Sequence, residues 1–245
     1  MAVLKLVKDP FLLQIFYKNN IKKICRFDPM ICNKDTAKKT AKLLLSINAV
    51  KLQPQEPFTW ASGWQSPIYC DNRILLSYPD VRLFIKDAFV KHIQDNYPDV
   101  AVIAGVATGA IAIAALVADA LNLPFVYVRP KPKAHGRQNQ IEGYLHAGQK
   151  VLVIEDLIST GMSSMQAVKA LETAQADVLG MYAVFTYNFA QSKDLFLKAN
   201  LKTYTLSNYP ILLEEASIEG FISESERHIL ESWRQHPSTW HFPLK

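Results

Sequence analysis

Cysteine is scarce in this 245-residue chain, which contains only Cys25, Cys32 and Cys70. Three is an odd number, and none of these residues forms a Cys-x-x-Cys pair or has metal-ligand spacing to a histidine. The pattern indicates reduced thiols, and we therefore expect a cytoplasmic protein.

Excess charge is absent from most of the chain. The formal net charge is +5, and residues 1–29 hold six Lys or Arg side chains against two Asp. The rest of the chain is thus close to neutral, whereas a nucleic-acid binder usually has a strongly basic face. We expect no nucleic-acid partner.

A convincing membrane segment is also lacking. Residues 100–118 contain no formally charged side chain, and Gly105 and Gly109 have the spacing of a transmembrane dimer. Their Ala-rich composition and the break at 107–109 favour a buried strand, a turn and a buried helix instead. Charged residues and Pro10 interrupt the start of the chain, which excludes a secretory signal. We expect no membrane partner.

Strand and helix patterns alternate in the second half of the chain. Strands are predicted near 100–106, 125–129, 150–155, 178–187 and 202–206, and helices near 110–121, 162–174 and 192–199. Such alternation predicts an α/β fold, with helices flanking a mostly parallel central sheet. Hydrophobic residues make up 49% of the chain, which is enough for one domain with a sizeable core.

The domain is expected to have three parts after an N-terminal extension. Residues 1–29 lack a clean period, and regular patterns begin at Met30, which makes Met30 a candidate for the native start. We predict a small N-terminal hood over 30–98, a core over 99–207 and a helical tail over 208–245. Asn33 or Asp35 is expected to cap the first hood helix, and a capping-box spacing from Ser223 to Glu226 predicts the tail helix.

Residues 151–164 combine a buried strand, two acids and a loop of small residues. Glu155 and Asp156 are expected where the strand ends, before the small residues 159–161 and a helix. Backbone N–H groups and a helix N-terminus at such a loop can bind a phosphate. An ordinary capped connection is the alternative. The paired acids favour a site, because adjacent buried carboxylates need hydroxyls, amides or cations near them.

A long basic loop is predicted at the same edge of the sheet. Residues 130–147 separate two strands, and the first half of this segment is rich in Lys, His and Arg. A solvated run of charge is the alternative interpretation. Because ligands of parallel sheets bind beyond the carboxyl ends of the strands, we expect the turn 105–109, Arg129 and residues 155–163 along one edge. The loop could then close over a polyanionic substrate.

Together these segments resemble the orotate branch of the type I phosphoribosyltransferases over about residues 34–210. Residues 151–164 are similar to the phosphoribosyl pyrophosphate (PRPP) motif. The orotate branch is indicated by Phe58-Thr-Trp-Ala-Ser-Gly63 with Ser66-Pro-Ile-Tyr69, by Asp71-Asn-Arg73, and by Arg129-Pro-Lys-Pro-Lys-Ala-His-Gly136. The resemblance implies a Mg²⁺-dependent pentosyltransferase of pyrimidine (UMP) biosynthesis. It would transfer ribose 5-phosphate from PRPP to orotate, giving orotidine 5′-monophosphate and pyrophosphate.

The resemblance also implies site residues by position. Glu155 and Asp156 would bind the ribose hydroxyls. The 5-phosphate would be held by the backbone of Leu157, Ile158, Ser159, Thr160, Gly161, Met162 and Ser163. Orotate would contact Ser159, with Tyr69 and Tyr187 as further candidates.

The remaining expectations concern the diphosphate and the assembly. Arg129, Lys133 and His135 would bind the diphosphate, with Lys131 as a substitute for a missing cation of the loop. Mg²⁺ would be held mainly by PRPP, without a site made from protein side chains. In this family the loop serves the neighbouring subunit, so a homodimer with a shared site is implied.

The chain departs from the family pattern at several cationic positions. Many relatives have Lys at Ala61, at Gln65 and at Pro130, and an Arg is expected near Tyr187. The turn 105–110 likewise lacks a Lys found in some relatives. The pattern therefore does not identify which residues recognise the base. The alternatives are a purine-type transferase, which residues 58–67 disfavour, and a PRPP-sensing regulator, which the near-neutral charge disfavours.

Overall fold

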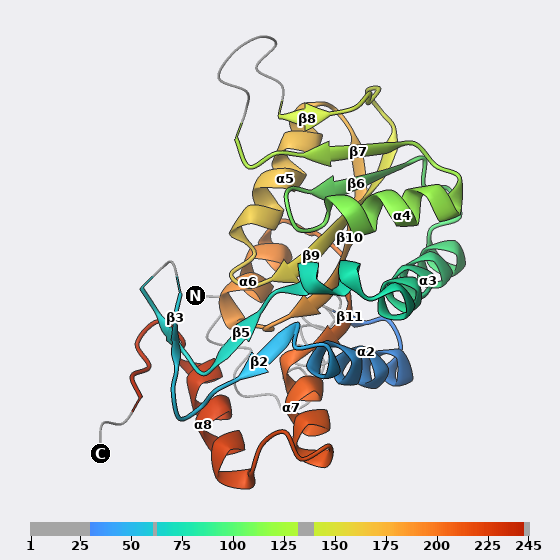
Figure 1. Ribbon diagram of the computed structural model, residues 1–245. Coiled ribbons are helices and arrows are strands. Elements are labelled where there is room, and N and C mark those ends of the chain that lie inside the picture. Colours follow the sequence, from blue (N-terminus) through green and yellow to red (C-terminus); the bar gives the residue numbers. More distant parts are fainter. Residues whose placement is uncertain (1–29, 61–62, 132–139, 243–245) are drawn as a thin grey trace, which may run out of the picture.

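A seven-stranded sheet forms the centre of the protein (Figure 1). The computed structural model describes residues 30–60, 63–131 and 140–242. Neighbouring strands are parallel except at the β7–β8 edge. The strand order is β1 (Met30–Ile31), β11 (Thr203–Asn208), β10 (Asp177–Thr186), β9 (Lys150–Ile158), β6 (Val102–Val106), β7 (Phe125–Val128) and β8 (Ile141–Glu142). The predicted α/β class is confirmed.

Helices cover both faces of the sheet because its central strands are apolar on both sides. In Figure 1, α3 (Pro79–Asn96) and α4 (Ile111–Leu121) lie on one side, and α5 (Met162–Thr173) and α6 (Ala190–Lys198) lie on the other. Alternate residues of each strand enter different clusters. Leu152 and Ile154 pack with the first side, and Val151 and Val153 pack with the second.

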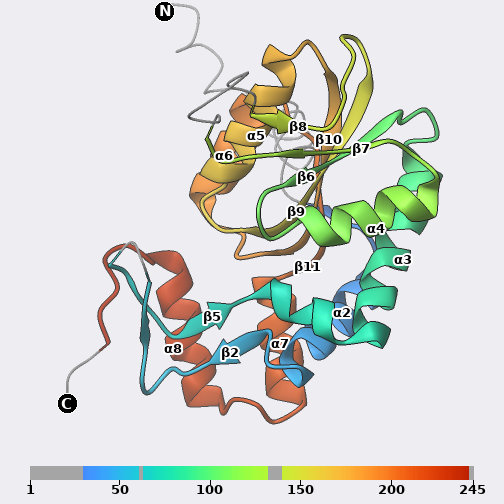
Figure 2. The same cartoon turned by 45° about the horizontal axis from the view of Figure 1, so that its top comes forward.

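The hood lies below this sheet and is built from short elements (Figure 2). Two small antiparallel sheets pair β2 (Val50–Leu52) with β5 (Ile68–Cys70) and β3 (Phe58–Thr59) with β4 (Gln65–Ser66). A 3₁₀ helix, η2 (Asn72–Ser77), follows β5 and leads into α3. The hood also contains α2 (Lys34–Ser46).

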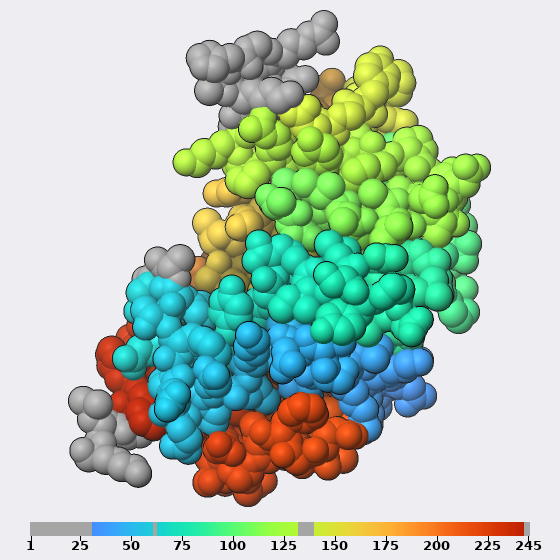
Figure 3. All heavy atoms as spheres, in the orientation of Figure 1, coloured from blue at the N-terminus to red at the C-terminus, as the bar shows by residue number. Residues whose placement is uncertain are grey.

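The tail packs against the hood and is not a separate layer. It consists of α7 (Tyr209–Ile218) and α8 (Glu224–Gln235). In Figure 3 the red tail lies directly against the blue residues of the hood. The Trp233 indole N–H donates to the Gln65 carbonyl at 3.0 Å, which joins α8 to β4. The hood and residues 209–242 therefore support one another, although they are distant in sequence.

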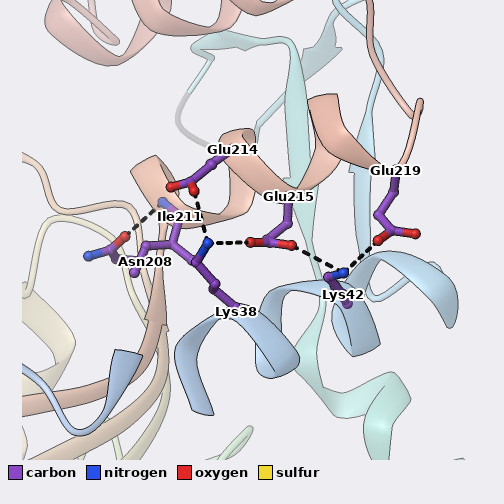
Figure 4. Close-up of polar contacts among 7 residues, drawn as sticks. All are labelled: Lys38, Lys42, Asn208, Ile211, Glu214, Glu215 and Glu219. Carbon is purple, nitrogen blue, oxygen red and sulfur yellow. Dashed lines mark hydrogen bonds and ion pairs between the residues drawn. The ribbon is translucent and has the colours of Figure 1, made fainter. Parts of the chain in front are cut away.

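An ion-pair network fixes α7 on α2 (Figure 4). Glu215 is only 2% exposed, and each of its carboxylate oxygens lies 3.4 Å from a lysine Nζ, one of Lys38 and one of Lys42. Each lysine also pairs with a more exposed acid, Lys38 with Glu214 at 3.0 Å and Lys42 with Glu219 at 2.6 Å. Because a buried carboxylate is costly without opposite charge, this network specifies how the two helices align.

The predicted helix starts are confirmed. The Asn33 side chain accepts hydrogen bonds from the N–H groups of Asp35 and Thr36 at the start of α2. Ser223 and Glu226 form the reciprocal capping box of α8. No helix in the described ranges has the length and apolar character that crossing a membrane requires.

One predicted boundary is wrong. The strand expected to end near residue 155 continues as β9 to Ile158, because β10 pairs with it as far as Thr186. Glu155 and Asp156 therefore lie inside the strand, beyond the last pairing of β6, which joins Gly105 to Ile154. The short strands β1 and β8 were not predicted, and α7 was expected only as part of a helical tail, without bounds of its own.

Trp233 is the centre of an aromatic cluster that joins the hood, the core and the tail. It is fully buried, and its ring lies 5.5–5.7 Å from the rings of four residues that belong to all three parts: Trp60, Tyr187, Phe189 and Tyr209. Such pairs contribute more than their buried area alone.

We predict that Trp233→Ala lowers the free energy of unfolding by about 3–5 kcal/mol, because it leaves a cavity among these rings. Chemical denaturation monitored by circular dichroism measures this change. The half-buried Trp240 supplies the control, and Trp240→Ala should cost clearly less. Equal losses from both variants would contradict a central role for Trp233.

Candidate functional site

The site lies where the strand order of the sheet reverses. Strands β6 and β9 are parallel neighbours, and from them the chain proceeds in opposite directions, to β7 and to β10. Loops that leave such a pair separate and open a crevice at the carboxyl ends of the strands. A cavity of about 330 Å³ occupies this position, lined by Cys70, Asp71, Arg73, Val106, Ala107, Thr108, Gly109, Glu155, Asp156, Leu157 and Ser163.

Glu155 is a buried acid on the floor of this cavity. It is 4% exposed, and its oxygens accept hydrogen bonds from the Ser164 hydroxyl at 2.9 Å and the Asp156 N–H at 3.1 Å. Burial raises the pKa of Glu155 well above its usual range, and the neighbouring Asp156 charge raises it further. The charged form of Glu155 is therefore less favourable here than in water, and a ligand or cation that compensates the charge would stabilise it.

Asp156 projects against the turn between β6 and α4. A Cβ atom added at Gly109 would overlap the Asp156 carboxylate, so only glycine allows this approach. The peptide bond between Ala107 and Thr108 in the same turn is cis. The predicted neighbourhood of the turn 105–109 and the two acids is confirmed, although the sequence did not reveal this contact.

The loop that follows the acids leads into a helix start that has no capping side chain. Gly161 has φ +81°, and a Cβ there would lie 2.9 Å from the Phe196 ring, so both conformation and space require glycine. The next residue begins α5, whose first turn has no side-chain cap and no acid. Its backbone N–H groups and the helix dipole remain for an anionic ligand. Ser159 and Thr160 are half-buried in this loop, while Met162 and Ser163 are exposed.

The hood closes the cavity from the other side. Asn72 is 1% exposed, and its side-chain amide donates to the Asp156 carbonyl at 2.6 Å. This bond fixes the 3₁₀ helix against β9. The neighbouring Asp71 and Arg73 form a two-pronged pair at 2.7 and 2.8 Å on the rim. The triplet 71–73 was recognised in the sequence only as part of a motif, and its position over Asp156 was missed.

The structure describes only the two ends of the basic loop. Lys133 and His135 lie outside the described residues. Arg129 follows β7, and its guanidinium lies 3.5 Å from Glu142 across the β7–β8 hairpin. Lys131 is exposed, and neither Arg129 nor Lys131 lines the cavity. Strand β8 shortens the expected 18-residue connection, because the Arg129 N–H bonds the Gln140 carbonyl at 2.8 Å.

The two tyrosines singled out for the base have different surroundings. Tyr69 is 42% exposed and directly precedes Cys70, which lines the cavity, and its ring lies 5.6 Å from that of Phe58. Tyr187 is 2% exposed within the aromatic cluster of Trp233, and it does not reach the cavity. The structure therefore leaves Tyr187 in the core, and neither tyrosine is among the residues that line the cavity.

Size alone does not identify the site. A larger cavity of about 590 Å³ lies between the start of α6 and the residues after α8. None of its lining residues is acidic, whereas the smaller cavity combines Asp71, Glu155 and Asp156 with two glycine-dependent turns nearby. Perturbed carboxyl groups at a strand switch point are the stronger indication of function.

Comparison with known proteins gives the class. Residues 75–209 match the family described as "Phosphoribosyl transferase domain". The orotate phosphoribosyltransferase of Aeropyrum pernix has a TM-score of 0.65 at 26% identity, covering 75% of this chain and 99% of that one. Leishmania donovani UMP synthase has a TM-score of 0.66 at 24% identity, covering 80% of this chain and 42% of that chain, and indicates the fold alone. Fold and site define a type I phosphoribosyltransferase.

Curated relatives are considerably more similar in sequence. The orotate phosphoribosyltransferase of Porphyromonas gingivalis is 52% identical over 207 residues, which cover 84% of this chain and 99% of the relative. That of Listeria innocua is 52% identical over 203 residues, with coverages of 83% and 97%. The chain belongs to the orotate phosphoribosyltransferase family.

The raised pKa of Glu155 has a consequence for stability. An acid whose pKa is raised by folding weakens the folded state as the pH increases from the pKa of the unfolded chain, about 4.3, through the folded value. Glu155→Gln removes the ionisable carboxyl group and with it this pH-dependent loss of stability. We predict that the melting temperature of the variant exceeds that of the wild type by more at pH 8 than at pH 5.

Thermal melts at both pH values measure this difference. Glu172→Gln, which changes an exposed acid on α5, is the matched control for the loss of one carboxylate. A Glu155→Gln variant that is less stable at pH 8 would show that the buried carboxylate stabilises the fold.

Proposed function

We propose that this protein is an orotate phosphoribosyltransferase. The N1 atom of orotate forms a bond to C1 of the ribose while the bond from C1 to the diphosphate oxygen breaks. Pyrophosphate leaves with that electron pair, and orotidine 5′-monophosphate is formed for pyrimidine synthesis. The observation that carries the proposal is about 50% identity to orotate phosphoribosyltransferases over more than four-fifths of this chain.

In this proposal the anion loop and the two acids bind PRPP. The 5-phosphate accepts hydrogen bonds from the backbone between Leu157 and Ser163, where the uncapped N-terminus of α5 supports the assignment. Glu155 and Asp156 bind the ribose hydroxyls, which would satisfy carboxyl groups that the protein alone leaves poorly compensated. The acids also lie near C1, where positive charge develops as the leaving group departs.

The diphosphate is assigned to the basic loop and to Mg²⁺. Arg129, Lys133 and His135 bind it, with Lys131 as a further candidate. The described residues contain no cluster of three or more metal-ligating side chains, although carboxylates line the cavity. This donor set fits Mg²⁺, which usually binds one or two carboxylates together with substrate phosphates. When bound, Mg²⁺ would neutralise charge on the departing pyrophosphate.

Orotate recognition and assembly complete the proposal. The base contacts Ser159 and the exposed ring of Tyr69, while the burial of Tyr187 argues against the third candidate. We also propose a homodimer in which the basic loop of one subunit serves the site of the other. The cytoplasmic location suggested by the reduced cysteines stays a prediction.

The loss of orotate ultraviolet absorbance on mixing with PRPP and Mg²⁺ tests the activity directly. We expect turnover with orotate, none with adenine, hypoxanthine or uracil, and loss of turnover after chelation of Mg²⁺. Turnover of a purine without turnover of orotate would overturn the proposal. Light scattering of the same preparation tests the dimer, and a monomeric mass with full activity would contradict the shared site.

The contact between Gly109 and Asp156 gives a prediction for catalysis. In Gly109→Ala the added methyl group displaces the Asp156 carboxylate, which can rotate away without unfolding the protein. We predict a loss of kcat/KM of roughly a hundredfold, as expected when a positioning group moves by about 1 Å. Gly148→Ala is the control, because a Cβ there meets no atom within 4 Å, although its φ of +79° adds some strain. Equal activity losses in the two variants would contradict the role of this contact.

A further inference from the structure

The charge balance of the cavity points to Arg73. Three acids line the cavity: Asp71, Glu155 and Asp156. Among the described lining residues, Arg73 is the single cation. Both substrates of the proposed reaction are anions, since orotate carries a carboxylate and PRPP carries phosphate groups. A cavity that presents mainly carboxylates needs a positive group to admit them.

Arg73 is held in a defined orientation. Its Nε–H and one Nη2–H donate to the two Asp71 carboxylate oxygens at 2.7 and 2.8 Å, and its backbone N–H donates to the same carboxylate at 3.1 Å. This pairing holds the pKa of Asp71 below its usual range. The buried amide of Asn72 anchors the intervening residue to Asp156. The rigid Asp71-Asn72-Arg73 turn therefore aims the guanidinium at the rim of the cavity.

The guanidinium keeps hydrogen-bonding capacity in this arrangement. A guanidinium has five N–H groups, and Asp71 uses two of them. The Arg73 side chain is 59% exposed. A pair this exposed contributes little to stability, so stability does not account for so ordered an arrangement. A planar guanidinium with spare donors suits a carboxylate or a phosphate.

Other cationic positions of the family pattern are occupied differently in this chain. Tyr187 is buried among aromatic rings. Gln65 is engaged with the tail, because its carbonyl accepts from Trp233 and its side chain accepts from the Phe242 N–H at 3.1 Å. The turn 105–110, where some relatives have a Lys, contains no cation in this chain. Arg73 reaches this cavity from the hood instead.

We propose that Arg73, oriented by Asp71, is a substrate-contacting residue that binds an oxyanion group of a substrate of this reaction. The group is either the carboxylate of orotate or the diphosphate of PRPP, and both have the same hydrogen-bonding chemistry. This inference rests on the proposed function and adds to it the cation that the sequence pattern leaves unassigned.

Steady-state kinetics of Arg73→Gln and Arg73→Lys test the proposal. Loss of a charged hydrogen bond should raise KM for one substrate by about 10- to 100-fold, with a smaller rise for the lysine variant. A higher KM for orotate alone would show that Arg73 binds the orotate carboxylate. A higher KM for PRPP, together with weaker inhibition by pyrophosphate, would show that Arg73 binds the diphosphate. Asp71→Asn should raise the same KM less, since it frees the guanidinium without removing it.

Arg227→Gln is the matched control. Arg227 donates to Glu231 at 3.0 Å on α8 and does not line the cavity, so its loss should leave both KM values unchanged. Folded Arg73 variants with wild-type KM and kcat would overturn the inference while the proposed function stands. If the wild type itself does not turn over orotate, the proposed function fails. Calorimetric titration of wild type and Arg73→Gln with pyrophosphate and with orotate then decides, because equal affinities overturn the role of Arg73 and weaker binding supports it.

Discussion

Two acids on consecutive residues of one buried strand are the constraint on which the site depends. The Glu155 carboxylate accepts a hydrogen bond from the Ser164 hydroxyl. The Asp156 carboxylate lies against Gly109 in the turn after β6, and the Asp156 carbonyl accepts a hydrogen bond from the Asn72 side chain. Such acids are costly to bury without partners. The strand pairing, the turn at Gly109 and the 3₁₀ helix of the hood are therefore all arranged around them. A sugar with adjacent hydroxyls is the kind of ligand that would satisfy these acids.

Contacts between the hood and the tail, outside the cavity, help to hold the hood in place over these acids. Trp233 bonds the carbonyl of Gln65, and Glu215 on α7 pairs with two lysines of α2. Both interactions connect the last forty residues with the hood. The position of Arg73 over the acids therefore depends on packing by residues that do not line the cavity. Stability and function are coupled through the hood in this fold.

Much of the core could be predicted from sequence because its signals are local. Residues 151–154 are fully buried, with side chains on both faces of the sheet, so they form an uninterrupted apolar run in the sequence. Asn33 and Ser223 are typical capping residues, and each marks the start of its helix. Strand β8 could not be predicted, because its two residues are held by pairing with β7 rather than by a pattern of their own. Helix α7 is apolar on most sides and follows β11 without a break, so its sequence carries little period.

The same distinction holds for the site. The acids and the loop at 159–163 are contiguous and were predictable, whereas the contacts of Gly109 and Asn72 join residues far apart in sequence. The burial of Tyr187 beside Trp233 could not be predicted, because the rings that surround it come from distant parts of the sequence. A crystal structure with PRPP bound tests the central claim most directly. The 5-phosphate should lie on the backbone N–H groups of residues 159–163, with the ribose hydroxyls on Glu155 and Asp156. A phosphate bound elsewhere, for example in the larger cavity beside α6, would contradict this assignment of the site.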